Sequence, residues 1–182
     1  MRRPVGGTLD AILRSARVVD SHVQDGFATA LPASRSAWRG VRLERMRIGS
    51  AELFDTDLVS VALRASKVDD LNARGARWTD VLLEDCVVAT LDLAGATLRR
   101  IAFQRCRIGT LEVSGTTCTH VDLRTTSIGH VNGLEGLRGA TIDTGQLIEL
   151  APALARNLGI VVADPEPLVR DAGSRAAVDR AG

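Results

Sequence analysis

Aromatic residues are scarce in this chain of 182 residues, at 3% of the composition, and tyrosine is absent. A globular core of this size usually depends on bulky aromatic side chains. Here 45% of the residues are hydrophobic, so the core must be closed mainly by Leu, Val, Ile and Ala. The sequence therefore favours a regular architecture of small repeated layers over an irregular globular core.

The chain also lacks an excess of either charge and any long apolar run. Its 23 basic and 22 acidic residues give a net charge of +1, and Lys67 is the only lysine. Such a balance does not call for a nucleic acid, a membrane or a polyacidic partner. We see no segment suited to a signal peptide or a transmembrane helix. We therefore expect a cytoplasmic protein that binds another protein, with no direct nucleic-acid or membrane contact.

What the chain does have is a period of five residues from Ser36 onward, as in SAWRG, VRLER, MRIGS, AELFD and TDLVS. The third residue of each five is nearly always apolar, the first is small or aliphatic, and the others are mostly polar. This period fits neither the 3.6 residues of a helix nor the 2 of a strand. Each five-residue step is therefore expected to turn one corner and point two side chains inward.

A second period of twenty residues groups the fives into coils. Residues twenty apart should then stack at strand spacing, about 4.8 Å. The central residues sort into columns of consistent type, as in Trp38, Leu58, Trp78, Leu98 and Cys118, and in Leu43, Leu63, Leu83, Phe103 and Leu123. The first residues beside both tryptophans are all small, and small beside large suits close packing of a fixed interior volume. Glycines also recur at corner positions: Gly75, Gly95 and Gly115 in one column, and Gly49, Gly109 and Gly129 in another.

The fives resemble the A-(D/N)-L-x-x pattern of pentapeptide-repeat proteins, most plainly in Ala51-Glu52-Leu53, Thr56-Asp57-Leu58, Leu91-Asp92-Leu93 and Val121-Asp122-Leu123. The resemblance covers roughly residues 36–133. It implies an all-β solenoid, a right-handed quadrilateral β-helix with short helical caps. The motif is specific for fold and poorly specific for function.

Four segments follow from this pattern. Residues 1–15 are expected to form an N-terminal cap with Leu9, Ile12 and Leu13 as its apolar face. Residues 16–140 form the β-helix, of which 16–35 is a degenerate first coil with Pro32 and Ala33 at poor positions. Residues 141–163 form a C-terminal cap resembling the tail of many actinobacterial members of the family. Residues 164–182 are polar and are expected to be a disordered tail.

The C-terminal cap should begin with Asp143-Thr144 as a helix N-cap and end near Gly159. Leu147, Ile148, Leu150, Leu154 and Leu158 give it an apolar stripe. We expect Pro152 to break or kink it and so give two short helical pieces, with Ile160-Val161-Val162 packing against the last coil. If the helix is not fully docked, Leu147, Leu154 and Leu158 make this cap a candidate for homodimerisation.

The cysteines and histidines give no catalytic or metal motif. Cys86, Cys106 and Cys118 form no CxxC, and their odd number fits a reducing compartment. Cys86 and Cys106 stand one coil apart in one inward column, either as a redox or metal pair or, as we favour, as buried thiols in small-residue positions. His22, His120 and His130 lack an evident nucleophile and orienting acid, and solvent-facing positions are favoured. We predict no enzyme, no cofactor and no metal.

The outward second positions hold the candidate interaction face, the column Glu52, Asn72, Asp92, Glu112 and Asn132. An adjacent column, Arg47, Lys67, Val87, Arg107 and Ser127, is partly basic. The functional interpretation is a charged docking face, and the alternative is ordinary solvated surface.

The favoured function is a non-catalytic protein-interaction scaffold. The alternative that the family resemblance implies is a DNA-mimic regulator of DNA gyrase or topoisomerase giving quinolone protection. Mimicry of DNA requires a strongly acidic rod. Here the arginines of the repeat roughly cancel its acids.

Overall fold

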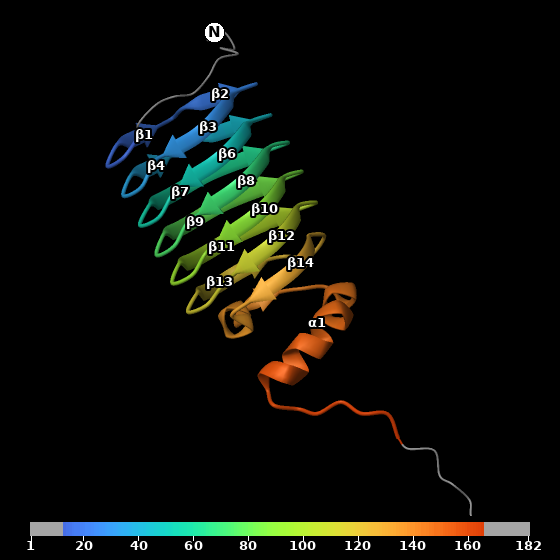
Figure 1. Cartoon of the computed structure of the whole chain (residues 1–182). Coiled ribbons are helices and arrows are strands. Elements are labelled where there is room, and N and C mark those ends of the chain that lie inside the picture. The colour runs from blue at the N-terminus through green and yellow to red at the C-terminus, as the bar shows by residue number, and fades with distance from the viewer. Residues whose placement is uncertain (1–12, 166–182) are drawn as a thin grey trace, which may run out of the picture.

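The computed structural model describes residues 13–165, which form a right-handed β-solenoid with one C-terminal helix (Figure 1). Six coils of twenty residues stack along its axis. We number them coil 1 (16–35), coil 2 (36–55), coil 3 (56–75), coil 4 (76–95), coil 5 (96–115) and coil 6 (116–135). The predicted fold is confirmed.

Two parallel sheets run the length of the solenoid and enclose its interior. The six-stranded sheet contains β3 (Phe27–Pro32), β6 (Arg47–Glu52), β8 (Lys67–Asn72), β10 (Val87–Asp92), β12 (Arg107–Glu112) and β14 (Ser127–Asn132). The nine-stranded sheet contains β1 (Arg17–Val19), β2 (His22–Gln24), β4 (Ala37–Arg39), β5 (Arg42–Glu44), β7 (Asp57–Arg64), β9 (Arg77–Glu84), β11 (Thr97–Gln104), β13 (Thr117–Asp122) and β15 (Ala140–Thr141).

The register between coils is twenty residues throughout the ladder from coil 1 to coil 6. Trp38 pairs with Leu58 and Leu58 with Trp78, and Leu83 pairs with Leu63 and Phe103. The first and third residues of the fives point inward and are buried almost without exception in coils 2 to 5. The period of five thus sets which side chains are inside, and the period of twenty sets which of them stack.

In coils 1 to 5, three of the four corners place the fifth residue of a five at positive φ, as at Arg45 (φ 52°), Asp85 (φ 53°) and Gly75 (φ 64°). The predicted turn role of Gly75, Gly95 and Gly115 is therefore confirmed. The fourth corner lies inside the strands of the six-stranded sheet. Gly49, Gly109 and Gly129 lie in those strands and not in left-handed turns, so the prediction of a corner turn was wrong for that column.

Coil 1 is regular in structure although its sequence departs from the pattern. Strands β1, β2 and β3 pair in register with β4, β5 and β6. Ala33 is fully buried, and Pro32 ends β3, the edge strand of its sheet, where a missing amide is tolerated. Leu13 packs half-buried against the core and donates its amide to the Pro32 carbonyl at 2.8 Å. The rest of the predicted N-terminal cap, with Leu9 and Ile12, lies outside the described residues.

After coil 6 the chain forms a short 3-10 turn, η1 (Leu134–Leu137), and then one continuous helix, α1 (Thr144–Asn157). Asp143 caps the helix as predicted, in a capping box with Gln146. The Gln146 side chain also donates to the Leu123 and Thr126 carbonyls at 2.7 and 2.6 Å, which fixes the helix to the last coils. Gly159 follows the helix with φ 71°, as expected of a residue that ends it.

Two expectations for this end were wrong. Pro152 lies inside α1 and does not divide it. Proline removes the bond to the carbonyl of Ile148, four residues earlier, and its ring crowds that carbonyl, yet the helix runs on to Asn157. Val161 and Val162 are 87% and 80% exposed and do not pack on the last coil, because the preceding helix carries the chain away from it (Figure 1). The predicted tail is described only as far as residue 165. No helix in residues 13–165 is long and apolar enough to span a membrane.

Candidate interaction surface

The acidic column of the sequence analysis, Glu52, Asn72, Asp92, Glu112 and Asn132, forms one line on the solenoid. Each member is the last residue of a strand in the six-stranded sheet, from β6 to β14. Register pairs connect Glu52 to Asn72, Asn72 to Asp92, Asp92 to Glu112 and Glu112 to Asn132. The structure thus brings all five predicted residues together, and their role in binding stays a prediction.

Three members of the column hold the turn that follows their strand. The side-chain oxygens of Asn72, Asp92 and Glu112 accept the amides of Arg74, Ala94 and Ser114 at 3.2, 3.0 and 2.9 Å. Hydrogen bonds from the side chain and the amide of Ser114 hold the pKa of Glu112 below its ordinary value. Asp122 on another face accepts from the Arg124 amide at 3.0 Å in the same way. The second position of a five therefore carries a structural task that asparagine and carboxylates can all perform.

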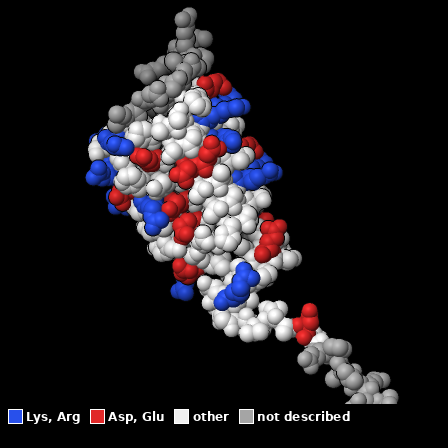
Figure 2. Space-filling model, in the orientation of Figure 1, with Lys and Arg blue, Asp and Glu red and all other residues white. Residues whose placement is uncertain are grey.

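Arginines partly neutralise the same column. Arg14 pairs with Glu52 at 3.1 Å, and Arg74 pairs with Asp92 at 2.9 Å. These pairs are partly exposed, so each contributes little to stability. Acidic and basic side chains are interspersed over the coils in the view of Figure 2. The column is thus a line of acceptor groups with reduced net charge, and not a continuous acidic rod.

The basic column, Arg47, Lys67, Val87, Arg107 and Ser127, begins the same strands whose last residues form the acidic column. The two columns therefore border one sheet at opposite ends of its six-residue strands, and the fourth corner of each coil lies between them. Phe27 continues the basic column into coil 1 and is 52% exposed, and Val87 within it is 43% exposed. The surface between the columns is narrow, regular and mostly formed by small residues.

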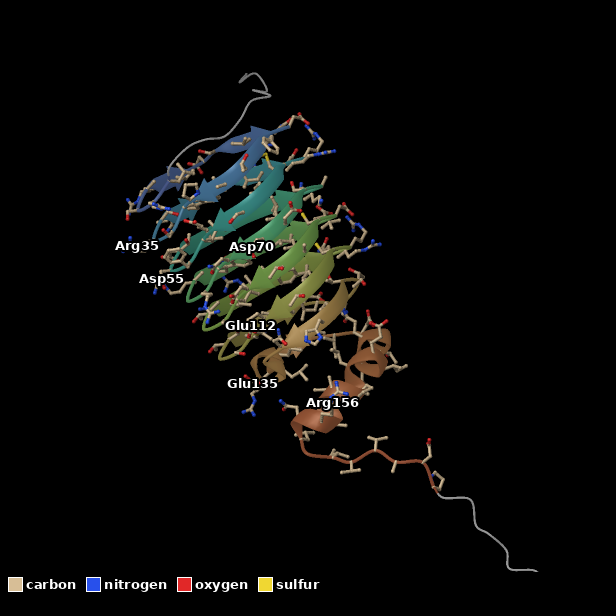
Figure 3. The ribbon with its side chains drawn as sticks, in the orientation of Figure 1. Arg35, Asp55, Asp70, Glu112, Glu135 and Arg156 are labelled. Atoms are coloured by element: carbon tan, nitrogen blue, oxygen red, sulfur yellow. The ribbon has the colours of Figure 1, made fainter. Side chains whose placement is uncertain are left out.

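Sequence reasoning missed two acids in the middle of this sheet, Asp69 and Asp70, both exposed on β8. Asp70 pairs in register with Ser50 and Thr90, and Figure 3 shows it on the same face as Glu112. Lys67 lies 3.3 Å from Asp69. The pattern of fives could have identified both, because each occupies an outward position of its five.

A second missed feature is a set of arginine–aspartate pairs between corner residues twenty positions apart. Arg45 binds Asp25 through two hydrogen bonds, at 2.6 and 2.8 Å, and Arg105 binds Asp85 at 2.7 and 3.0 Å. Arg100 and Asp80 form a similar bidentate pair. Hydrogen bonding to these arginines holds the pKa of Asp25, Asp80 and Asp85 below the ordinary value. The pairs connect successive coils, so they act on the solenoid itself.

The cysteines lie inside, where the sequence placed them. Cys86 and Cys106 are 1% and 4% exposed. The Cys86 thiol donates to the Leu63 and Glu84 carbonyls, as the Ser66 hydroxyl in the same column donates to the Arg64 carbonyl. Hydrogen bonding to Cys106, and then burial, raise the pKa of the Cys86 thiol. Cys118 is half-buried. The two stacked thiols thus occupy positions that serine and threonine fill in other coils.

The three histidines lie at the surface. Among the described residues, none of them contacts a nucleophile together with an orienting acid. His120 is exposed at a corner with φ 54°, and His130 contacts Asn132 at 3.0 Å. His22 lies 3.5 Å from Glu44. Between residues 13 and 165, no group of three or more His, Cys, Asp or Glu side chains is arranged to hold a metal ion.

The five-residue step, the two inward side chains per step and the twenty-residue register together define a pentapeptide-repeat solenoid. No family model matches the chain, and no curated protein matches its sequence. Among solved structures, the chain is similar to two trypsin-treated variants of QnrB1, a plasmid-mediated fluoroquinolone resistance protein. Each is 18% identical with a TM-score of 0.31, and the matches cover 87% and 88% of this chain and 97% of QnrB1.

Proposed function

We propose that the protein is a non-catalytic scaffold that binds another protein across its six-stranded sheet. The observation that carries the proposal is the pair of oppositely charged columns along the two borders of that sheet. A partner with acidic and basic groups at a matching separation could contact both columns at once. Because the columns repeat at every coil, such a partner could contact several coils in succession.

The rigidity of the surface supports this proposal. Each strand of the sheet is paired in register with its neighbours from β3 to β14, and the turn after it is held by its own acidic-column residue in coils 3 to 5. A surface that is already ordered loses little conformational freedom on binding. The exposed Phe27 and Val87 add apolar contact area beside the basic column.

The proposal is tested by affinity capture with the wild type and with the triple variant Glu52→Gln, Asp92→Asn, Glu112→Gln. These changes remove three charges, and at Asp92 and Glu112 they keep the side-chain oxygen that accepts the turn amide, as Asn72 does naturally. We expect the wild type to retain a protein that the triple variant releases, and added salt to weaken the binding.

The matched control is Asp20→Asn, Glu44→Gln, Asp57→Asn, which removes three charges from the strands and a turn of the nine-stranded sheet. This control should retain the same protein as the wild type. A wild type that retains nothing, or a triple variant that binds as the control does, contradicts the proposal.

The alternative, a DNA-mimic regulator of gyrase, rests on the same acidic column. It is less favoured because Arg14 and Arg74 pair with two of the column's acids and the column contains two asparagines. A supercoiling assay with purified gyrase separates the two functions. The scaffold proposal expects no effect at micromolar protein, and inhibition that the acidic-column triple variant abolishes would favour the mimic.

We also propose that the C-terminal cap forms a homodimer. Of the three leucines expected here, Leu147 and Leu158 are 50% and 72% exposed and Leu154 is half-buried. Ile148, Ile160, Val161 and Val162 are further exposed apolar residues at this end of the chain. A second copy can cover this apolar surface by the same patch on both subunits. Sedimentation should show a dimer that Leu158→Glu dissociates and Asn157→Glu, on the adjacent exposed residue, does not. A monomeric wild type would overturn this proposal.

A further inference from the structure

The interior of coils 1 to 4 contains a cavity of about 40 Å³. Its wall is formed entirely by apolar side chains, among them Trp38, Ala51, Leu58, Leu71 and Trp78. The residues around it are buried, but several keep a small accessible fraction: Leu43 and Leu63 are 8% exposed and Leu53 is 7% exposed. In coils 4 and 5 the corresponding Leu93 and Phe103, which do not line the cavity, are each 1% exposed.

The cavity coincides with one interruption in a column of leucines. The first residues on this face are Leu31, Ala51, Leu71, Leu91 and Leu111, and Ala51 pairs in register with Leu31 and Leu71. All three of these line the cavity. An alanine between two leucines at strand spacing leaves the space that a third leucine side chain would fill.

Water is a poor occupant of this space. The volume exceeds the ~10–15 Å³ that one water molecule requires, but water also needs two or more polar partners. The indole N–H groups of Trp38 and Trp78 are buried without a hydrogen-bond partner and are not accessible to a water-sized sphere. Since no accessible polar atom faces the cavity, we expect it to contain no water, as is usual for apolar cavities.

We infer that this cavity is a binding site for a small apolar ligand about the size of a xenon atom. The ligand would gain dispersion contacts with the surrounding leucines and indoles and would give up no hydrogen bond. The site differs from the proposed docking surface, because it lies inside the coils and is independent of the charged columns.

Tryptophan fluorescence tests the inference, because the chain has only two tryptophans and both line the cavity. Xenon quenches indole emission when it is in contact with the ring. We expect buffer equilibrated with xenon to quench the wild type relative to argon, and degassing to restore the emission. Both indoles are at most 4% exposed, so quenching by collision from the solvent should be small.

Ala51→Leu should fill the cavity and lose most of this quenching. The matched control is Ala62→Leu, the same change on an outward position of β7 whose register partner is Leu82, and it should quench as the wild type does. Ala51→Val, a smaller addition, serves if the leucine variant does not fold. Absence of quenching in the wild type, or equal quenching in a folded Ala51 variant, would overturn the inference.

Discussion

The junction between coils 2 and 3 and the junction between coils 4 and 5 have the same backbone and differ in their side chains. Both keep the twenty-residue register and the full parallel ladder. The second is tightly filled and is crossed by ion pairs of Arg100 with Asp80 and of Arg105 with Glu84 and Asp85. The first contains the cavity beside Ala51, and no ion pair between residues 13 and 165 crosses it. The ladder thus sets the path of the chain, while side-chain volume and pairing set how strongly successive coils adhere.

The largest effect is expected from a charge placed in an inward column of coil 4, which borders both the cavity and the tight junction with coil 5. Leu83→Asp puts an unpaired carboxylate in a column where Leu83 is 2% exposed. The desolvation cost is several kcal/mol, comparable with the ~5–15 kcal/mol stability of a whole domain, so the chain should lose its cooperative fold by circular dichroism. Leu82→Asp, on the adjacent outward position, should fold normally. A cooperative Leu83→Asp variant would show that the inward columns are wrongly assigned.

Leucine truncations in one column compare the two regions directly. Leu91→Ala should lower the free energy of unfolding by about 3–5 kcal/mol, because the fully buried Leu91 side chain would lose all of its packing contacts. Leu71→Ala should cost about 1 kcal/mol less, because Leu71 already borders the cavity. Denaturant unfolding of both variants measures the difference. Equal costs would mean that the cavity does not loosen the packing around Leu71.

Replacement of a buried alanine by leucine should change the free energy of unfolding in opposite directions in the two regions. Ala51→Leu should raise the free energy of unfolding by about 1 kcal/mol, since it buries new methyl groups in existing space. Ala76→Leu, at a fully buried position beside Trp78, should lower it by about 1–3 kcal/mol through overpacking. Thermal unfolding of the two variants is the measurement, and destabilisation by both would argue that coils 2 and 3 have no usable space.

The smallest effect is the dependence of stability on pH through the arginine–aspartate pairs. The pKa of Asp80 and Asp85 is lowered in the folded state by hydrogen bonds from Arg100 and Arg105. The stabilisation they give is therefore complete above the unfolded carboxyl pKa of about 3.9 and is lost as the pH falls through the lower folded values. Unfolding titrations from pH 6 to about pH 2 should show a smaller loss for Asp80→Asn/Asp85→Asn than for the wild type. The control Asp20→Asn/Asp57→Asn, for acids with no such pairing, should follow the wild type.

Much of the fold could be predicted because a repeat carries its own register. The identity of residues twenty apart placed Trp38 and Trp78 in one column and Leu83 inside without any knowledge of tertiary structure. The C-terminal end has no repeat, and there the prediction failed. The helix continues through Pro152, although proline lacks the amide that would bond the Ile148 carbonyl. The bonds from Gln146 to the carbonyls of coil 6 could not be read from the sequence either, because they depend on where the helix lies.

The candidate surface was only half predictable, for a related reason. The column position of Glu52, Asp92 and Glu112 follows from the repeat, but their turn bonds and the pairing with Arg74 depend on side-chain conformation. The arginine–aspartate pairs likewise need the positive φ of the corner residues as well as the spacing of twenty. Cavity volume depends on all surrounding side chains together, although Ala51 in a leucine column was visible in the sequence.

The weak junction between coils 2 and 3 also bears on how the protein comes apart. In a solenoid each coil contacts only its neighbours, so unfolding is expected to start at the weakest coupling. The predicted intermediate keeps coils 3 to 6 and releases coils 1 and 2. Release would expose β7 and β8 as new sheet edges, with unpaired backbone groups open to pairing with another chain. One missing leucine side chain at position 51 would then set both the point of separation and the surface most prone to aggregate.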